Sequence, residues 1–291
     1  MSAVPGAAPV LRSTHVARPV DEAFAVFTRQ IGAWWPLPSH GIFTAEQVRE
    51  AVNPPGDLHT APTSLVCFEN THNGGGGRVW PLASLREVVV EARAHDLRVH
   101  LDGARLMNAA VATGTPAAEY GRKFDTVTLC LSKGLGCPLG AVVAGSHQRM
   151  AKARRYKHLF GGAMRQAGIV AAAGLYALDN HVDRLAEDHA NARRLGEGLA
   201  EAGLPVDLEQ VETNFVLLDV TRLGLTGDEA IARLRRDGVL LSFAARTDVL
   251  RAVTHLDVTG EQIDDAVARI PRALSGARRS AELATDAPTP Y

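Results

Sequence analysis

The pattern of apolar and polar positions divides most of the chain into short buried strands and longer amphipathic helices. Apolar runs predict strands over 65–68, 97–101, 126–131, 141–144, 213–218 and 250–258. Helical spacing of apolar residues predicts helices over 44–52, 81–95, 147–160, 182–202, 228–236 and 262–274. Thr44, followed three residues later by Gln47, has the sequence of a capping box. Strands that alternate with helices in this way are typical of an α/β fold with a parallel sheet.

Two polar stretches that follow predicted strands contain candidate cofactor-binding residues. Asp102 follows the strand over 97–101, and Lys133 follows the strand over 126–131 on a loop rich in glycine and proline. Open α/β sheets gather their ligand sites at the carboxyl ends of strands. Pyridoxal phosphate needs a lysine that bonds to it and a carboxylate that keeps its ring nitrogen protonated. A lone lysine here is most often a solvated surface charge, so the pair, rather than Lys133 alone, favours this cofactor.

Three longer motifs carry a more specific similarity. They are HLDGARLMNAA from His100, LSKGLGCPLG from Leu131, and FGGAMRQAG over 160–168. In this order they resemble the low-specificity threonine aldolases of the β-eliminating lyase family, which are fold-type I enzymes dependent on pyridoxal phosphate. The resemblance runs from about residue 41 to about residue 272. It implies an α/β fold: a transferase-like large domain with a mostly parallel, incomplete sheet, and a small α+β C-terminal domain.

The resemblance also implies an activity and assigns residues to it. The reaction is aldol cleavage of L-threonine or L-allo-threonine to glycine and an aldehyde, which makes the chain a carbon–carbon lyase. Lys133 would hold pyridoxal 5'-phosphate covalently, and Asp102 would contact its ring nitrogen. Arg105 would contact the cofactor or the substrate carboxylate. From the residues alone, Arg105 could instead form an ion pair with Asp102.

Three further residues are matched to family positions. His59 lies 13 residues before His72 of the ENTHN motif, the spacing of a family histidine that approaches the substrate's β-hydroxyl. Arg165 matches an arginine that reaches a cofactor phosphate across a subunit boundary, and Arg251 matches the arginine that binds the substrate α-carboxylate. Without the family, His59 would be read as a solvated loop histidine and Arg251 as a charge at a sheet edge. The resemblance predicts no metal site.

The first 43 residues depart from this family. A predicted strand over 10–18, an amphipathic helix over 21–30 and the Trp34-Trp35-Pro36 sequence resemble the start of a START-like (SRPBCC) domain related to the Hsp90 ATPase activator. The family's Ser-Gly-Thr phosphate loop and its ring-stacking histidine have no counterpart before residue 41, and His15 matches the histidine only in its spacing to His59. We expect four segments in chain order: a fused fragment and leader over 1–43, a remnant of the cofactor-binding large domain over 44–175, a small domain over 176–275 and a disordered tail over 276–291.

Composition narrows the possible partners and compartment. The chain has 291 residues and a formal net charge of −1, which gives no case for binding nucleic acid. No apolar run of about 18 residues predicts a membrane span. Cys67, Cys130 and Cys137 are odd in number and unpaired in spacing, which favours a reducing, cytoplasmic compartment. The expected partner is a small amino-acid substrate, and the family implies a homo-oligomer, a dimer or a homotetramer.

Three functions remain open at the level of sequence. The first is a threonine aldolase whose activity is impaired by the altered N-terminal segment. The second is a catalytically inactive gene-fusion product that retains the aldolase motifs. The third is a START-like lipid-binding or cochaperone module, but the long sheet and final helix of that fold do not follow Trp35. The ordered motifs favour the first.

Overall fold

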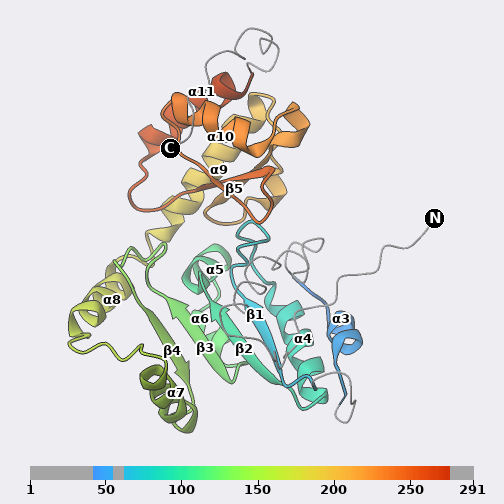
Figure 1. Ribbon diagram of the computed structural model, residues 1–291, viewed down its shortest axis with the longest axis vertical. Helices are drawn as coiled ribbons and strands as arrows, with labels where there is room; N and C mark the ends of the chain where they lie inside the picture. The colour runs from blue at the N-terminus through green and yellow to red at the C-terminus, as the bar shows by residue number, and fades with distance from the viewer. Residues whose placement is uncertain (1–41, 55–61, 276–291) are drawn as a thin grey trace, which may run out of the picture. The chain divides into compact units, whose positions relative to one another are not determined.

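The computed structural model describes residues 42–54 and 62–275, which fall into two compact units (Figure 1). The first unit extends to Ala186, and the second begins at Glu187. Across these described ranges, every helix is too short or too polar to cross a membrane.

A mostly parallel sheet forms the centre of the first unit. Within its described part, the strands β1 (Leu65–Glu69), β2 (Arg98–Gly103), β3 (Thr126–Cys130) and β4 (Ala141–Gly145) lie side by side in that order. The first three strands are parallel, and β4 runs antiparallel to β3. The helices that precede or connect them are α3 (Ala45–Ala51), α4 (Leu82–Ala94), α5 (Leu106–Thr113) and α6 (Ala117–Gly121). This architecture confirms the predicted α/β class.

The two faces of this sheet differ in burial. Val66, Phe68, Val99 and Leu101 are buried and share a core with apolar side chains of α4. Successive side chains of a strand point to opposite faces, so Asp102 and the residues that pair with it on the neighbouring strands lie on the other, more exposed face. The register sets Glu69 opposite Asp102 and sets Asp102 opposite Thr128. Packing of one face therefore fixes a row of polar groups on the other.

The capping box predicted at the first helix is confirmed. Thr44 Oγ1 accepts a hydrogen bond from the Gln47 backbone N–H at 3.2 Å, and the Gln47 side chain accepts one from the Thr44 N–H at 2.8 Å. These two bonds satisfy N–H groups that have no partner within the helix. The boundary of α3 was therefore readable from local sequence.

Helices α7 (His147–Leu159) and α8 (Gly168–Asn180) lie beside β4 at the edge of the sheet (Figure 1). As the sequence predicted for this basic segment, α7 lies on the surface, and none of its described side chains is buried. On α8, a Cβ at Gly174 would lie 3.0 Å from Leu131 Cδ1, which shows how closely the helix approaches the end of β3. Phe160 and Ile169 are more than four-fifths exposed. This edge thus leaves apolar surface uncovered.

The second unit is an α+β domain, as predicted. Its elements are α9 (Leu185–Glu201), η2 (Leu208–Gln210), β5 (Phe215–Asp219), η3 (Val220–Leu223), α10 (Gly227–Arg236), β6 (Ser242–Phe243), β7 (Val249–Val253) and α11 (Gly260–Ser275). Among residues 187–275 the strands form one antiparallel sheet in the order β5-β7-β6. Leu218, Leu234, Leu250 and Ile270 are fully or almost fully buried in its core.

The sequence analysis placed the end of one strand wrongly and did not predict the helices α5, α6 and α8. The strand predicted over 250–258 ends at Val253. Thr254 Oγ1 instead donates a hydrogen bond to the Asp188 carbonyl at 2.6 Å, and a turn closes from the Val258 N–H to the His255 carbonyl. Helix α8 was missed because its sequence, GIVAAAGLYALDN, is apolar on all sides and has no amphipathic period.

Asp125 links several elements of the first unit. Its carboxylate accepts hydrogen bonds from the Val99 N–H at 2.9 Å, from Arg93 of α4 at 2.7 Å and from Arg149 of α7. Burial opposes ionisation of this carboxyl, but these bonds and charges outweigh it and hold the pKa of Asp125 below its usual range. The depressed pKa means that the stabilisation is present above the unfolded-state value and is lost as the pH falls through the folded-state value.

We therefore predict that Asp125→Asn lowers the free energy of unfolding by about 1.5–3 kcal/mol at neutral pH, because it weakens charge-assisted hydrogen bonds. The difference from the wild type should shrink below about pH 4, where the native carboxylate also becomes protonated. Urea unfolding followed by circular dichroism at several pH values measures both effects. Asp183→Asn, an exposed carboxylate in the same unit, is the control and should change neither. Equal stability of Asp125→Asn and wild type would contradict the prediction.

Candidate active site

Asp102 stands near the carboxyl end of β2, with an exposed side chain. Its backbone carbonyl accepts a hydrogen bond from the Asn70 N–H at 2.9 Å, which ties the ends of β1 and β2 together. The neighbours Leu101 and Gly103 are buried, and a Cβ on Gly103 would lie 2.3 Å from the Thr128 carbonyl oxygen. The strand is thus closely packed on either side of Asp102, and its carboxylate is presented on a rigid element.

Lys133 lies on a tight loop directly after β3. The loop is closed by hydrogen bonds from the Leu131 N–H to the Gly140 carbonyl at 3.0 Å and from the Cys137 N–H to the Leu131 carbonyl at 3.1 Å. The Gly136 N–H donates to the carbonyl of Lys133 itself at 2.8 Å, and Gly136 adopts a φ of 74°. The Lys133 side chain is exposed, so its amine is accessible to solvent while hydrogen bonds fix the backbone of its loop.

The next position of this loop is closely packed. A Cβ on Gly134 would lie 2.8 Å from Leu185 Cδ2 and 3.4 Å from Asn108 Oδ1. A larger residue there would require the Leu185 side chain or the loop to move. The small-residue composition that marked this loop in the sequence therefore has a packing reason as well as a chemical one.

Arg105 joins the same region from the start of α5. Its N–H donates to the Asn70 carbonyl at 3.1 Å, and its side chain and that of Lys133 line the same small cavity of about 10 Å³. The structure therefore brings together three of the residues predicted from sequence: Asp102, Arg105 and Lys133.

The last residue of β1, Glu69, is a further carboxyl group to which sequence reasoning assigned no role. Burial, followed by the charge of Asp102, raises the pKa of Glu69, while an Asn73 N–H bond and the charges of Lys133 and Arg105 oppose this. Glu69 therefore interacts electrostatically with Asp102, Arg105 and Lys133. Its signal in the sequence was its place at the end of a strand that pairs with the strand of Asp102.

His72 of the ENTHN motif is a buried neutral histidine. It is 2% exposed, and burial lowers its pKa to about 4. Its Nδ1 accepts a hydrogen bond from the Gly75 N–H at 2.8 Å, so the ring proton lies on Nε2, 3.6 Å from Glu69 Oε2. His72 thus stabilises the loop that follows Glu69.

The remaining predicted site residues belong to other parts of the chain. His59 lies outside the described residues. Arg165 is exposed on the segment between α7 and α8. Arg251 belongs to β7 of the second unit.

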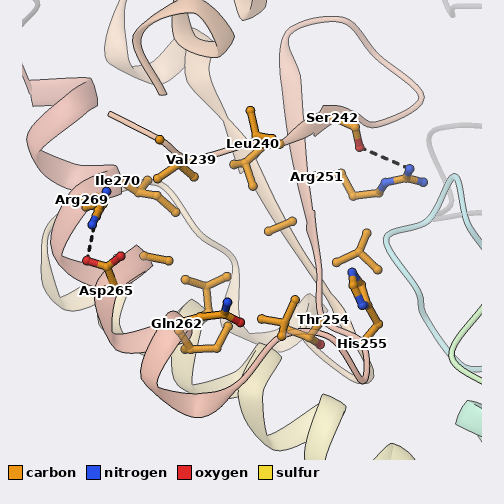
Figure 2. Close-up of a pocket in the computed structure, with 18 of the residues that line it drawn as sticks. Val239, Leu240, Ser242, Arg251, Thr254, His255, Gln262, Asp265, Arg269 and Ile270 are labelled. Atoms are coloured by element: carbon orange, nitrogen blue, oxygen red, sulfur yellow. Dashed lines mark hydrogen bonds and ion pairs between the residues drawn. The ribbon is translucent and has the colours of Figure 1, made fainter. Parts of the chain in front are cut away.

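Arg251 has surroundings of its own. It lines a cavity of about 710 Å³ within the second unit (Figure 2). Its Nη2 donates to Ser242 Oγ at 3.3 Å, and its guanidinium carbon lies 5.2 Å from the centre of the Phe215 ring. Burial lowers the pKa of the Arg251 guanidinium. A cation that has lost part of its hydration binds a carboxylate more strongly than one in bulk water.

The residues of the first unit fit the ring end of pyridoxal phosphate. The exposed amine of Lys133, on a loop fixed by hydrogen bonds, and the exposed carboxylate of Asp102 lie at the carboxyl ends of two neighbouring parallel strands. These are the groups that the aldehyde and the ring nitrogen of this cofactor require. Lys133 and Asp102 are therefore the residues of this chain that could hold it.

Comparisons with known proteins agree with this arrangement. The model of the beta-eliminating lyase family matches residues 6–222. The low specificity L-threonine aldolase of Escherichia coli K12 is 42% identical over 214 residues, which cover 74% of this chain and 61% of that protein. The probable low-specificity L-threonine aldolase 2 of Arabidopsis thaliana is 38% identical over 213 residues, with 73% and 60% covered. The chain thus spans about three-fifths of the length of these relatives.

Solved structures show the same fold. A threonine aldolase from Leishmania major has a TM-score of 0.64 at 20% identity and covers 81% of this chain and 68% of its own. A putative aromatic amino acid beta-eliminating lyase/threonine aldolase from Exiguobacterium has a TM-score of 0.63 at 19% identity, with 80% and 66% covered. The predicted fold-type I architecture is therefore confirmed.

The resemblance of the N-terminal segment to a START-like domain is not borne out. The family match begins at residue 6 and so includes most of the segment on which that resemblance rested, and residues 1–41 lie outside those the structure describes. From the extent of this match, together with the clustered Asp102, Arg105 and Lys133, we conclude that the chain belongs to the beta-eliminating lyase family.

Proposed function

We propose that this chain is a pyridoxal phosphate-dependent aldehyde-lyase that cleaves L-threonine and L-allo-threonine to glycine and an aldehyde. The observation that carries the proposal is that Asp102 lies near the carboxyl end of β2 and Lys133 lies on the loop after β3, the parallel neighbour of β2. The names of its relatives, low-specificity L-threonine aldolases, support the same reaction.

Two residues would hold the cofactor. Lys133 would bond to it through its amine, from a loop whose backbone is fixed by hydrogen bonds on both sides. Asp102 would accept a hydrogen bond from the ring nitrogen and keep that nitrogen protonated. When bound, pyridoxal phosphate supplies an electron sink for the charge left at the substrate Cα. Arg165 is proposed to bind its phosphate, on the strength of the family resemblance.

Three residues would act on the substrate. Arg105 and Arg251 are proposed to bind the α-carboxylate, since a guanidinium presents two parallel donors to a planar carboxylate. His59 is proposed to take the proton of the β-hydroxyl, because a histidine titrates near neutral pH. These roles rest on matched family positions. The half-burial of Arg251 and the contact of Arg105 with the loop after β1 support those two.

The predicted organisation is carried forward as part of the proposal. Residues 44–175 would form the cofactor-binding domain, and residues 176–275 the small domain, although α8 crosses that boundary. We also propose a cytoplasmic homo-oligomer, a dimer or a tetramer. The uncovered apolar side chains beside β4, such as Phe160 and Ile169, support association with other protein surface.

The second candidate is a catalytically inactive product of gene fusion. The observation behind it is that residues 1–41 of the sequence contain no Gly-rich phosphate loop with serine or threonine. Measured cofactor binding and glycine release separate the two candidates.

The first test concerns Lys133. We expect borohydride reduction in the presence of pyridoxal phosphate to leave the pyridoxyl group on Lys133, because its loop is held at the end of the strand next to that of Asp102. Peptide mapping by mass spectrometry locates the label. Lys152 and Lys157 on the exposed helix α7 are internal controls and should carry little. A label mainly on either of these, or equal labelling in Lys133→Ala, would show that Lys133 is not the anchor.

The second test concerns Asp102. Asp102→Asn should still carry the pyridoxyl group on Lys133, but it should slow exchange of the glycine Cα proton about 10²–10³-fold, because the ring nitrogen is no longer held protonated. Proton NMR in deuterium oxide measures the exchange. Asp183→Asn should exchange at the wild-type rate. Equal exchange in Asp102→Asn and wild type would mean that this carboxylate is not the partner of the ring.

The third test concerns the N-terminal segment. Phosphate is normally bound by several backbone N–H groups. Each charge-assisted hydrogen bond that is missing weakens binding by about tenfold or more. We expect the chain to bind pyridoxal phosphate weakly, and a chimera with residues 1–40 replaced by the opening segment of a full-length aldolase to bind tightly and release glycine from threonine. Spectroscopic titration of both proteins measures this. Tight binding and full turnover by the unaltered chain would contradict it.

A further inference from the structure

The turn that carries Lys133 is held by a histidine at the C-terminal end of α8. Lys133 is the first residue of this turn, which is closed by the hydrogen bond from the Gly136 N–H to the Lys133 carbonyl at 2.8 Å. The carbonyl of Leu135, within the turn, accepts a hydrogen bond from Nδ1 of His181 at 2.7 Å. His181 lies 46 residues further along the chain, as the C-cap of α8. The turn is thus tied to an element that is distant in sequence.

The imidazole of His181 is itself fixed in place. A carbonyl oxygen can only accept, so Nδ1 of His181 carries the proton. The backbone N–H of His181 donates to the Ala177 carbonyl at 2.8 Å, and the Tyr176 ring lies at 87° to the imidazole with a centroid separation of 5.4 Å. The His181 side chain is partly buried, so a substitution that removed its donor would leave the Leu135 carbonyl short of a partner in a place with restricted access to water.

The other contacts between this loop and α8 are less directional. Leu131, Leu135 and Cys137 are buried in an apolar core that includes residues of α8. Apolar packing holds surfaces together but fixes no bond angle. The Cys137 thiol donates to the Ala173 carbonyl at 3.5 Å, and a thiol is a weak donor. The imidazole N–H of His181 is therefore the stronger and shorter of these two polar attachments.

We propose that His181 is a positioning residue for Lys133: its hydrogen bond to Leu135 fixes the turn from which the lysine side chain projects. This rests on the proposed role of Lys133 as the cofactor anchor. A lysine side chain rotates about several bonds, so the protein controls its reach chiefly through the backbone that carries it. A pyridoxal phosphate ring that must meet Lys133 at its aldehyde and Asp102 at its nitrogen tolerates little displacement of that backbone.

The first measurement uses the full chain without cofactor. His181→Leu removes the donor and keeps an apolar side chain, whereas His181→Asn keeps an N–H donor the same number of bonds from the backbone. We expect the amides of a peptide covering residues 131–140 to exchange with deuterium roughly tenfold faster in His181→Leu, and at close to the wild-type rate in His181→Asn. His147→Leu, at an exposed histidine of the same unit, is the matched control and should exchange as the wild type does.

Hydrogen exchange also separates local loosening from global unfolding. A peptide covering α4 should exchange at the same rate in all four proteins, because α4 lies outside the loop that His181 holds. Equal exchange of residues 131–140 in His181→Leu and wild type would overturn the proposal. Equally fast exchange in His181→Leu and His181→Asn would overturn it as well, because the restored donor would then have no effect.

The second measurement distinguishes positioning from accessibility by comparing two aldehydes. In reductive labelling the amine nitrogen bonds to the aldehyde carbon, the oxygen leaves as water with a proton from solvent, and the reductant delivers a hydride to that carbon. Formaldehyde needs no second contact, so methylation of Lys133 relative to Lys152 should be equal in all variants. Pyridoxyl labelling of Lys133 at limiting pyridoxal phosphate should fall roughly three- to tenfold in His181→Leu and recover in His181→Asn.

The labelling result is decisive in either direction. Equal pyridoxyl labelling in His181→Leu and wild type, despite a loosened loop, would show that the hydrogen bond does not position Lys133. A parallel fall in methylation would show that the amine had lost access and would also overturn the proposal. If wild-type Lys133 takes up no pyridoxyl group, the proposed function fails, and hydrogen exchange still decides whether His181 holds the turn.

A measurement on the wild type keeps the inference testable if His181→Leu does not fold. Nitrogen-15 NMR of the histidine side chains, assigned by the signal that His181→Asn removes, reports which ring nitrogen is protonated. A neutral histidine in water favours the Nε2–H form, so a neutral His181 with its proton on Nδ1 would support the hydrogen bond to Leu135. A neutral His181 protonated on Nε2 would overturn the proposal, because that form cannot donate from Nδ1.

Discussion

Parallel pairing of β1, β2 and β3 is the constraint on which the site in the first unit depends. The ladder places Glu69, Asp102 and Thr128 in one row across three strands. Because side chains alternate between faces, a slip of one residue would turn Asp102 into the core and Leu101 toward solvent. Burial of Val99 and Leu101 prevents such a slip. The apolar face of the sheet therefore determines where its polar face presents charge.

The loop after β3 places a lysine at the carboxyl ends of the parallel strands, where it could form a covalent bond to a ligand. Leu131 and Leu135 are buried on either side of Lys133, and Leu131 packs against α8 at Gly174. The backbone is held while the lysine side chain remains exposed. A fixed backbone and an accessible amine are what a residue needs if it is to bond repeatedly to a ligand from one direction.

Charge is distributed differently in the two units. In the first, burial and the charge of Asp102 raise the pKa of Glu69, and the charges of Lys133 and Arg105 oppose this rise. In the second, Arg251 stands half-buried over an aromatic ring, and burial is the cause of its lowered pKa. The first arrangement suits the control of protons, and the second suits the binding of an anion.

The sequence by itself determined the elements whose signals are local. The apolar runs gave the strands of the first unit, Thr44 and Gln47 gave a helix start, and the motifs around Asp102 and Lys133 gave the family. It missed α8, which is apolar on all sides, and it overextended the strand that ends at Val253, because the contact of Thr254 with Asp188 spans 66 residues.

Glu69 shows what only the tertiary structure decided. The sequence marks Glu69 only as the first residue of the ENTHN motif at the end of a strand, and its relation to Asp102 exists only once β1 and β2 pair in register. Which of the two carboxyl groups is the more buried is likewise a property of packing between distant segments. The local sequence determines which chemical groups are present. Pairing between distant strands determines which of them face one another and how exposed each is to water.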